Sequence, residues 1–215
     1  MLKENLLKLL PVLRHCPICG QFFSLVSFAC PSCREKLFYS ICPSKAETNL
    51  PFPVYSLWTW GKLDHFISFF LYSLKGAGNS CFYNKVAKEC FFHFSFLKKS
   101  VIYIPAAGRE KKLDHAGHFA KALADTTGKP SIFLNILHRQ KKQKQKRLSK
   151  AERIKSTVTL KEAATKEDLK KWNTKNIIFV DDVLTTGSTA LAAYKALDCP
   201  KSFCVLVLAY RPKIR

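Results

Sequence analysis

The second half of the chain alternates between apolar runs and amphipathic segments. Four of the runs have the length of strands: VIYI (101–104), SIFLNIL (131–137), NIIFVDD (176–182) and SFCVLVLAY (202–210). Between them, residues 115–128 and 188–198 have helical patterns, and the first of these stops at Gly128. Strands that alternate with helices predict an α/β fold with a parallel sheet covered on both faces. Ligands of such sheets bind at the carboxyl ends of the strands.

The first half predicts a different organisation. Residues 80–99 have helical length and end in two lysines, which a helix C-terminus favours. Two apolar runs, VYSLWTW (54–60) and HFISFFLYSLK (65–75), flank GKLD and predict a hairpin. PSKAETNLPFP (43–53) contains three prolines and predicts a linker. Residues 1–16 predict a short amphipathic helix ended by Pro11. We therefore expect a small module over residues 1–45 and an α/β domain over residues 51–215.

Five of the nine cysteines lie in the small module, and four of these form the pattern C-x2-C-x10-C-x2-C: Cys16, Cys19, Cys30 and Cys33. Each CxxC bends the chain so that two thiolates face one point, and two such bends complete a tetrahedral site for Zn²⁺. Four protein ligands leave no open position, so the predicted zinc is structural. Disulfides, or a ribbon that has lost its metal, are the alternatives. Cys42 and His15 lie nearby but outside the pattern.

Composition predicts a folded, strongly basic protein. Hydrophobic residues make up 47% of the 215 residues, while 36 Lys and Arg stand against 15 Asp and Glu, for a net charge of +21. This charge predicts attraction to polyanions such as nucleic acids, nucleotides or an acidic membrane surface. No run reaches the roughly 18 apolar residues that span a bilayer, and charged residues interrupt the N-terminal run, unlike a signal peptide. We expect a cytoplasmic protein whose cysteines are reduced or bind metal.

Much of the charge lies in one segment, HRQKKQKQKRLSKAERIK (138–155), which has nine Lys and Arg and one Glu. A segment this polar buries no core face, so we expect a flexible loop. It is either a solvated loop or a track for a nucleic-acid backbone. The candidate contacts are Arg139, Lys141, Lys142, Lys144, Lys146 and Arg147.

Two adjacent acids, Asp181 and Asp182, follow the apolar run IIFV. Small residues come next: Thr185, Thr186, Gly187, Ser188 and Thr189. A small-residue loop that leads into a helix presents backbone N–H groups to a phosphate. The loop has one glycine and no lysine, so it is neither a Walker A loop nor a dinucleotide fingerprint. Carboxylates beside a phosphate cradle suit a ribose 5-phosphate; the alternative is a helix cap beside a solvated acid.

VDDVLTTGST (180–189) resembles the phosphoribosyl-pyrophosphate (PRPP) motif of type I phosphoribosyltransferases. Together with the double CxxC, the chain resembles the ComF family of competence proteins, which is associated with natural transformation. Weaker matches are LKGAGN (74–79), IPAAGREKK (104–112) and the basic segment. The resemblance implies a type I phosphoribosyltransferase-like domain after a zinc ribbon, and it makes the basic segment a hood that closes over the ligand.

The resemblance also implies roles for individual residues. Asp181 and Asp182 would bind the ribose hydroxyls or act through Mg²⁺, and residues 185–189 would hold the 5-phosphate. Arg109 and Lys111 would contact the pyrophosphate. Residues 115–121 (HAGHFAK) keep only the glycine of the Arg-Gly-Phe-Asn-Gln segment usual in the family, and Thr185 stands where purine salvage enzymes have an acid. The sequence assigns no catalytic residue.

Two main functions follow as hypotheses. The first is a competence factor that handles single-stranded DNA during natural transformation, binding PRPP with Mg²⁺ and DNA without sequence specificity. Its partners would include competence or DNA-translocation proteins, with peripheral association at the inner membrane. The second is a Mg²⁺-dependent phosphoribosyltransferase for a nucleobase-like acceptor. A zinc adapter that docks a protein partner is a third reading, which has no identifying feature in the sequence.

Overall fold

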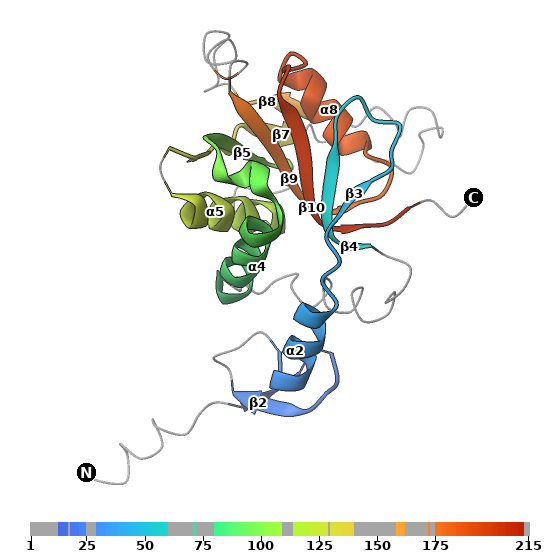
Figure 1. Ribbon diagram of the computed structural model, residues 1–215, viewed down its shortest axis with the longest axis vertical. Coiled ribbons are helices and arrows are strands. Elements are labelled where there is room, and N and C mark those ends of the chain that lie inside the picture. Colours follow the sequence, from blue (N-terminus) through green and yellow to red (C-terminus); the bar gives the residue numbers. More distant parts are fainter. Residues whose placement is uncertain are drawn as a thin grey trace.

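The computed structural model describes residues 13–16, 18–24, 29–59, 71, 80–108, 114–128, 130–139, 158–161, 172 and 175–212. Its main feature is a six-stranded sheet in the order β3-β4-β10-β9-β5-β6 (Figure 1). The strands are β3 (Ser44–Ala46), β4 (Val54–Thr59), β5 (Val101–Pro105), β6 (Ile132–Phe133), β9 (Asn176–Leu184) and β10 (Phe203–Tyr210). Every pairing is parallel except β3 with β4. The predicted α/β class with a mostly parallel sheet is confirmed.

Helices cover both faces of this sheet. On one face, α4 (Ser80–His93) and α5 (His115–Thr127) share a core with strand residues such as Tyr103 and Ile178. On the other face, α8 (Ser188–Ala196) packs over Ile102 and Phe179. Neighbouring residues of one strand thus face opposite cores, as the two-residue period of a strand requires. Burial on both sides explains why the central strands are continuous apolar runs.

The predicted hairpin at residues 54–75 is wrong. Its first half forms β4, but among the described residues β4 pairs with β3 and β10 and not with a strand from residues 65–75. Most of residues 65–75 lie outside the described residues, and Leu71 is helical. Part of the predicted linker is β3, since Ser44 pairs with Ser56.

Other predicted elements differ in their bounds. The helix predicted over residues 80–99 ends at His93, and a 3-10 helix, η1 (Ser95–Lys98), follows it. The strand predicted over residues 131–137 is split between β6 and β7 (Leu137–Arg139), which belong to different sheets. The short helix predicted to end at Pro11 lies outside the described residues, and the strand β1 (Leu13–His15) follows it.

A short antiparallel ribbon brackets the basic segment. β7 pairs with β8 (Val158–Leu160), and the last pair in register is Arg139 with Val158. The chain therefore leaves and re-enters the described structure at neighbouring points on either side of residues 140–157. Nothing in the apolar pattern predicted β8, because three residues are too few to show a period.

The N-terminal module consists of the hairpin β1–β2, where β2 is Phe22–Ser24, and the helix α2 (Pro31–Tyr39). It packs directly against the α/β part, and its Leu37 belongs to the same core as Trp58 of β4. The indole Nε1 of Trp58 donates to Ser40 Oγ at 3.2 Å, while the Cys42 N–H donates to the Leu57 carbonyl at 2.9 Å. These contacts fix the end of α2 on β4. The division into domains near residue 45 stays a prediction.

Within the described residues, no helix combines the length and apolar character that crossing a membrane demands.

Candidate functional site

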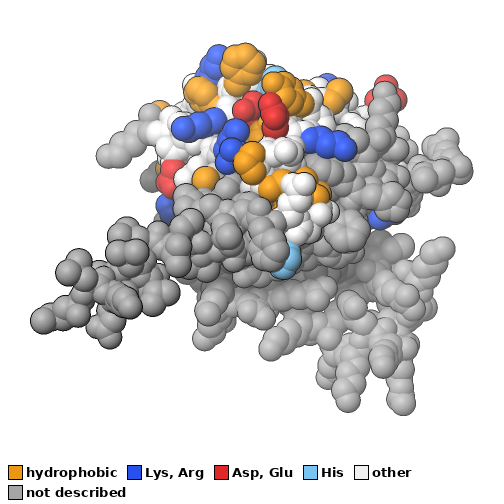
Figure 2. All heavy atoms as spheres, turned by 90° about the horizontal axis from the view of Figure 1, so that it is seen from below, with side chains coloured by type: hydrophobic (Ala, Val, Ile, Leu, Met, Phe, Trp, Pro, Cys, Tyr) orange, Lys and Arg blue, Asp and Glu red, His pale blue; other side chains and the backbone are white. Residues whose placement is uncertain are grey.

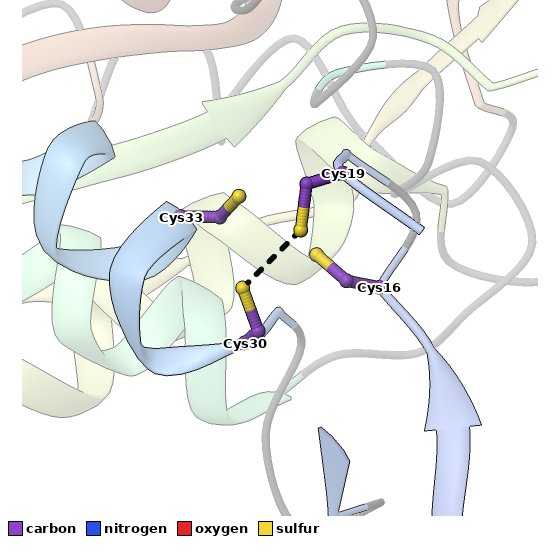
Figure 3. Close-up of side chains that lie close together, drawn as sticks. All are labelled: Cys16, Cys19, Cys30 and Cys33. Atoms are coloured by element: carbon purple, nitrogen blue, oxygen red, sulfur yellow. Dashed lines mark hydrogen bonds between the residues drawn. The ribbon is translucent and has the colours of Figure 1, made fainter. Parts of the chain in front are cut away.

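The four cysteines of the double CxxC come together at one point of the N-terminal module (Figure 3). Their sulfur atoms all lie within 4.8 Å of one another, and Cys19 Sγ is 3.5 Å from Cys30 Sγ. A tetrahedral zinc with Zn–S bonds of about 2.3 Å requires sulfur atoms about 3.8 Å apart. The four side chains converge from two segments, so the cluster has the ligands and the spacing for a structural metal such as zinc.

Local backbone structure explains how each pair reaches this point. Cys16 follows β1. Its N–H donates to the Gln21 carbonyl at 2.7 Å, and its carbonyl accepts from the Gly20 N–H at 2.9 Å, which closes a tight turn around Cys19. Gly20 has a φ of +76°, a conformation that favours glycine. Cys30 is the N-cap of α2, and Cys33 lies in the first turn of that helix. Two local motifs thus supply two ligands each.

The thiol pKa values show that burial and mutual repulsion oppose ionisation of Cys30 and Cys33 when no cation is bound. Burial and the neighbouring thiols raise the pKa of Cys33, and burial raises that of Cys30. Burial also opposes ionisation of Cys16, but backbone groups of Cys30, Cys19 and Ile18 outweigh it and lower its pKa to about 6. Several thiolates in one place repel each other unless a metal ion neutralises them. All four cysteines are free of disulfides, and Cys42 is exposed outside the cluster.

The acid pair lies beside the boundary between β5 and β9, where the order in which the chain adds strands to the sheet reverses. β5 pairs with β9 only as far as Pro105 and Val180, and the chain then turns away at Ala106, whose N–H still bonds to the Val180 carbonyl at 2.8 Å. β9 continues beside β10 to Leu184, so Asp181 and Asp182 lie within the strand rather than after it. The helices that follow β5 and β9 cover opposite faces. Such a switch point is the usual ligand site of an open α/β sheet.

The loop after β9 surrounds a small cavity. Its volume is about 40 Å³, and its lining is Asp181 together with Val183–Ala190. A single water molecule needs roughly 10–15 Å³ by the same measure, so the cavity accepts a group of several atoms. Gly187 is the N-cap of α8. Because glycine has no side chain, it does not cap the first N–H groups of that helix. Thr186 Oγ1 lies 3.1 Å from Ser188 Oγ. The loop therefore presents hydroxyls and a helix N-terminus to one space.

Gly187 is required by this geometry. Its φ is +72°, and an added Cβ would lie 2.5 Å from Leu50 Cδ1. We expect Gly187→Ala to lower the free energy of unfolding by about 2 kcal/mol, measured by chemical denaturation, because both the backbone strain and the clash oppose it. In a Leu50→Ala background, the same substitution should cost clearly less. Equal losses in both backgrounds would show that the contact with Leu50 contributes nothing.

Sequence reasoning missed two residues, Asp114 and Tyr83, that interact electrostatically with the acid pair. Asp114 is the N-cap of α5, where its Oδ1 accepts from the Gly117 N–H at 3.1 Å. The hydroxyl of Tyr83, on α4, bonds to His115 Nδ1 at 3.1 Å. The pattern Asp-His-Ala-Gly signals a helix cap, but only the fold brings Asp114 toward β9. Gly108 is packed against Asp114, since an added Cβ would lie 2.9 Å from its Oδ2.

Electrostatics link these residues to the acid pair. Burial, then the charge of Asp182, and further the charge of Asp114 raise the pKa of Asp181 well above its usual range. Burial raises the pKa of Tyr83, and the carboxylates of Asp182 and Asp114 add to that shift. One Asp181 oxygen accepts from the Asp182 N–H at 2.8 Å. Three carboxyl groups close to a buried tyrosine form a site that favours a cation or a hydroxyl-rich ligand.

The remaining predicted site residues divide between the described structure and the rest. Thr185 and Thr186 are exposed, while Ser188 and Thr189 lie half-buried at the start of α8. Arg139 ends β7. The other predicted contacts lie outside the described residues: Arg109, Lys111, Lys141, Lys142, Lys144, Lys146 and Arg147.

Neither a scan of protein-family models nor a search of curated proteins found a match for this chain. Its fold and sites define an α/β protein with a mostly parallel six-stranded sheet and a four-cysteine cluster suited to a structural metal.

Proposed function

We propose that the protein binds PRPP together with Mg²⁺ and handles single-stranded DNA as a competence factor of the ComF type, built on a type I phosphoribosyltransferase-like domain. The observation that carries the proposal is the coincidence of the acid pair and the loop cavity at one switch point. The motif VDDVLTTGST supplies both of them in consecutive residues.

The chemistry of the switch point supports the PRPP part of the proposal. The 5-phosphate would occupy the cavity at residues 185–189, where it accepts hydrogen bonds from loop N–H groups and from the hydroxyls. Asp181 and Asp182 would accept hydrogen bonds from the ribose hydroxyls. Mg²⁺ prefers oxygen ligands, and a bound Mg²⁺ would supply the positive charge that Asp181, Asp182 and Asp114 otherwise lack. Arg109 and Lys111 follow β5 in the chain and are the candidates for the pyrophosphate.

Charge and topology support the DNA part. The net charge is +21, and the β7–β8 ribbon brackets residues 140–157, which carry eight of the Lys and Arg residues. Both ends of that segment are tied at one place, so it would track a phosphate backbone or close over the PRPP without leaving the molecule. Backbone contacts of this kind are sensitive to salt and tolerant of sequence. Transfer of the ribosyl group to an acceptor is a separate hypothesis, because binding a donor does not by itself accelerate its reaction.

Isothermal titration calorimetry with PRPP and Mg²⁺ tests the proposal. The wild type should bind, and Asp181→Asn with Asp182→Asn should weaken binding by at least about 100-fold, the scale on which losing a paired charge acts. Asp198→Asn is the matched control. Asp198 is exposed after α8 with a φ of +61°, which asparagine tolerates. Absence of heat with the wild type, or equal affinity of the double variant, would refute PRPP binding at this site.

Two further experiments distinguish DNA binding from ribosyl transfer. Fluorescence anisotropy with labelled oligothymidine should show binding that weakens with salt and with charge reversal at residues 141–147. A panel of nucleobase acceptors, assayed for pyrophosphate release, tests the transferase. Pyrophosphate release that disappears in the double variant would establish the enzyme; PRPP binding without release would exclude transfer to those acceptors.

A further inference from the structure

A groove lies between the N-terminal module and the α/β part, on the face formed by α2 and α4. Its volume is about 490 Å³. Five residues of α2 and one of α4 line it: Pro31, Arg34, Glu35, Phe38, Tyr39 and Lys85. Lys85 Nζ lies 4.1 Å from the centre of the Phe38 ring, so the two helices meet through a cation–π contact. The groove is therefore aromatic and positively charged.

The exposed side of α4 extends this groove along the helix. Cys81, Lys85, Lys88 and Phe92 are all exposed. At about 100° per residue, these four positions fall within roughly 60° of one another, so they form a single stripe. We refer to Arg34, Phe38, Tyr39, Lys85, Lys88 and Phe92 as the α2–α4 face.

Two aromatic side chains on this face are unusually exposed. Tyr39 is 81% exposed and Phe92 is 79% exposed. Among the described residues, Ile132 is the only other large hydrophobic side chain that is exposed. Seen from the end at which the N-terminal module lies, Lys and Arg side chains lie interspersed with hydrophobic ones around a few acidic groups (Figure 2). Exposed aromatic rings among cations provide both a stacking platform and phosphate contacts.

The charge of the face selects a polyanion. The α2–α4 face carries three cations, Arg34, Lys85 and Lys88, and the groove beside them contains one acid, Glu35. The one acid of α4, Glu89, lies 3.9 Å from His93. An anionic membrane would use the charge but has no planar group for Tyr39 and Phe92 to stack on. A single strand of DNA has both phosphates and unpaired bases.

We propose that the α2–α4 face binds single-stranded DNA. Arg34, Lys85 and Lys88 contact phosphates, and bases stack on Tyr39 and Phe92. The inference rests on the proposed DNA-handling function and adds a folded surface to the basic segment at residues 138–155. Because Cys30 and Cys33 anchor the start of α2, the metal cluster also positions half of this surface. Through α2, the N-terminal module then contacts the DNA directly.

The test is fluorescence anisotropy of a labelled 20-nucleotide oligothymidine with the full-length, zinc-loaded protein. Lys85→Glu with Lys88→Glu should weaken binding at least tenfold and reduce the slope of log affinity against log salt by about 1.4, since each of the two lost single-strand phosphate contacts contributes roughly 0.7. Tyr39→Ala and Phe92→Ala should each weaken binding about tenfold, as loss of base stacking does. Lys195→Glu with Lys201→Glu, on α8 and in the turn after it, is the control and should change affinity little.

The outcomes separate this inference from the proposed function. If the wild type fails to bind the oligonucleotide, the DNA-handling function is wrong. If the wild type binds and the variants of the α2–α4 face bind equally well, this surface is not the site and the basic segment remains the candidate. Loss with the charge reversals but not with Tyr39→Ala or Phe92→Ala would overturn the stacking arrangement. Loss of binding to phosphatidylserine vesicles alone would assign the face to lipid instead. Circular dichroism and zinc content confirm that each variant is folded.

Discussion

Replacing Cys33 with serine is expected to release the metal and unfold the N-terminal module. Within its described residues, the module contains two strands of three residues and one helix of nine, which is too little to bury a core of its own. A serine hydroxyl is a poor zinc ligand, and a structural zinc supplies about 10–16 kcal/mol of apparent binding free energy in small zinc-finger peptides at pH 7. If zinc occupies the cluster, loss of one ligand removes the largest single contribution to folding of this module.

Three measurements check this expectation. Elemental analysis should find one zinc per wild-type chain and little in Cys33→Ser. Thermal unfolding followed by circular dichroism should show a destabilised variant. Fluorescence of Trp58, which is buried and donates to Ser40 of the module, should report the release of α2. Cys42→Ser is the matched control, because Cys42 is exposed and outside the cluster. A metal-free wild type, or a Cys33→Ser variant as stable as the control, would contradict a structural metal.

The features that the sequence predicted well are those determined by neighbouring residues. The cysteine cluster is two local turns, and each CxxC specifies its own geometry before the pairs meet. β5, β9 and β10 are long apolar runs because both of their faces are buried. This apolar composition is visible in the sequence even when the neighbouring strands are unknown.

The features that the sequence did not predict depend on distant pairing. β4 takes β10 as its neighbour, about 150 residues later in the chain, and this occupies the edge that a local hairpin would have used. The approach of Asp114 to Asp181 arises only because β5 and β9 are adjacent and α5 begins at their common end. Likewise, the exposure of Phe92 differs from that of Phe82 on the same helix, and only packing decides which of them is buried. Aromatic composition alone does not separate core from surface.

Asp181→Asn is expected to stabilise the fold at neutral pH while it weakens the proposed ligand site. Burial and the charges of Asp182 and Asp114 raise the pKa of Asp181 in the folded protein above its value of about 4 in the unfolded chain. The folded state therefore binds the proton more tightly than the unfolded state does. The stabilisation that comes from this tighter proton binding is complete below about pH 4 and is lost as the pH rises through the raised pKa. Asparagine carries no charge and still accepts the Asp182 N–H, so it avoids this loss.

The signature of this effect is its pH dependence. Wild type and Asp181→Asn should have similar free energies of unfolding below about pH 4, and the difference should grow at higher pH to about 0.5–2 kcal/mol, the usual range for relieving strain at a functional site. Asp114→Asn keeps the helix cap but removes one of the charges that act on Asp181, so it should give a smaller gain with the same pH dependence. Asp198→Asn should give no such gain. If Asp181→Asn were destabilising at pH 7, with a loss independent of pH, then the carboxylate would be an ordinary structural group. A pH-dependent gain accompanied by loss of PRPP binding would instead mean that the protein retains an unfavourable charge at the switch point because its ligand requires it.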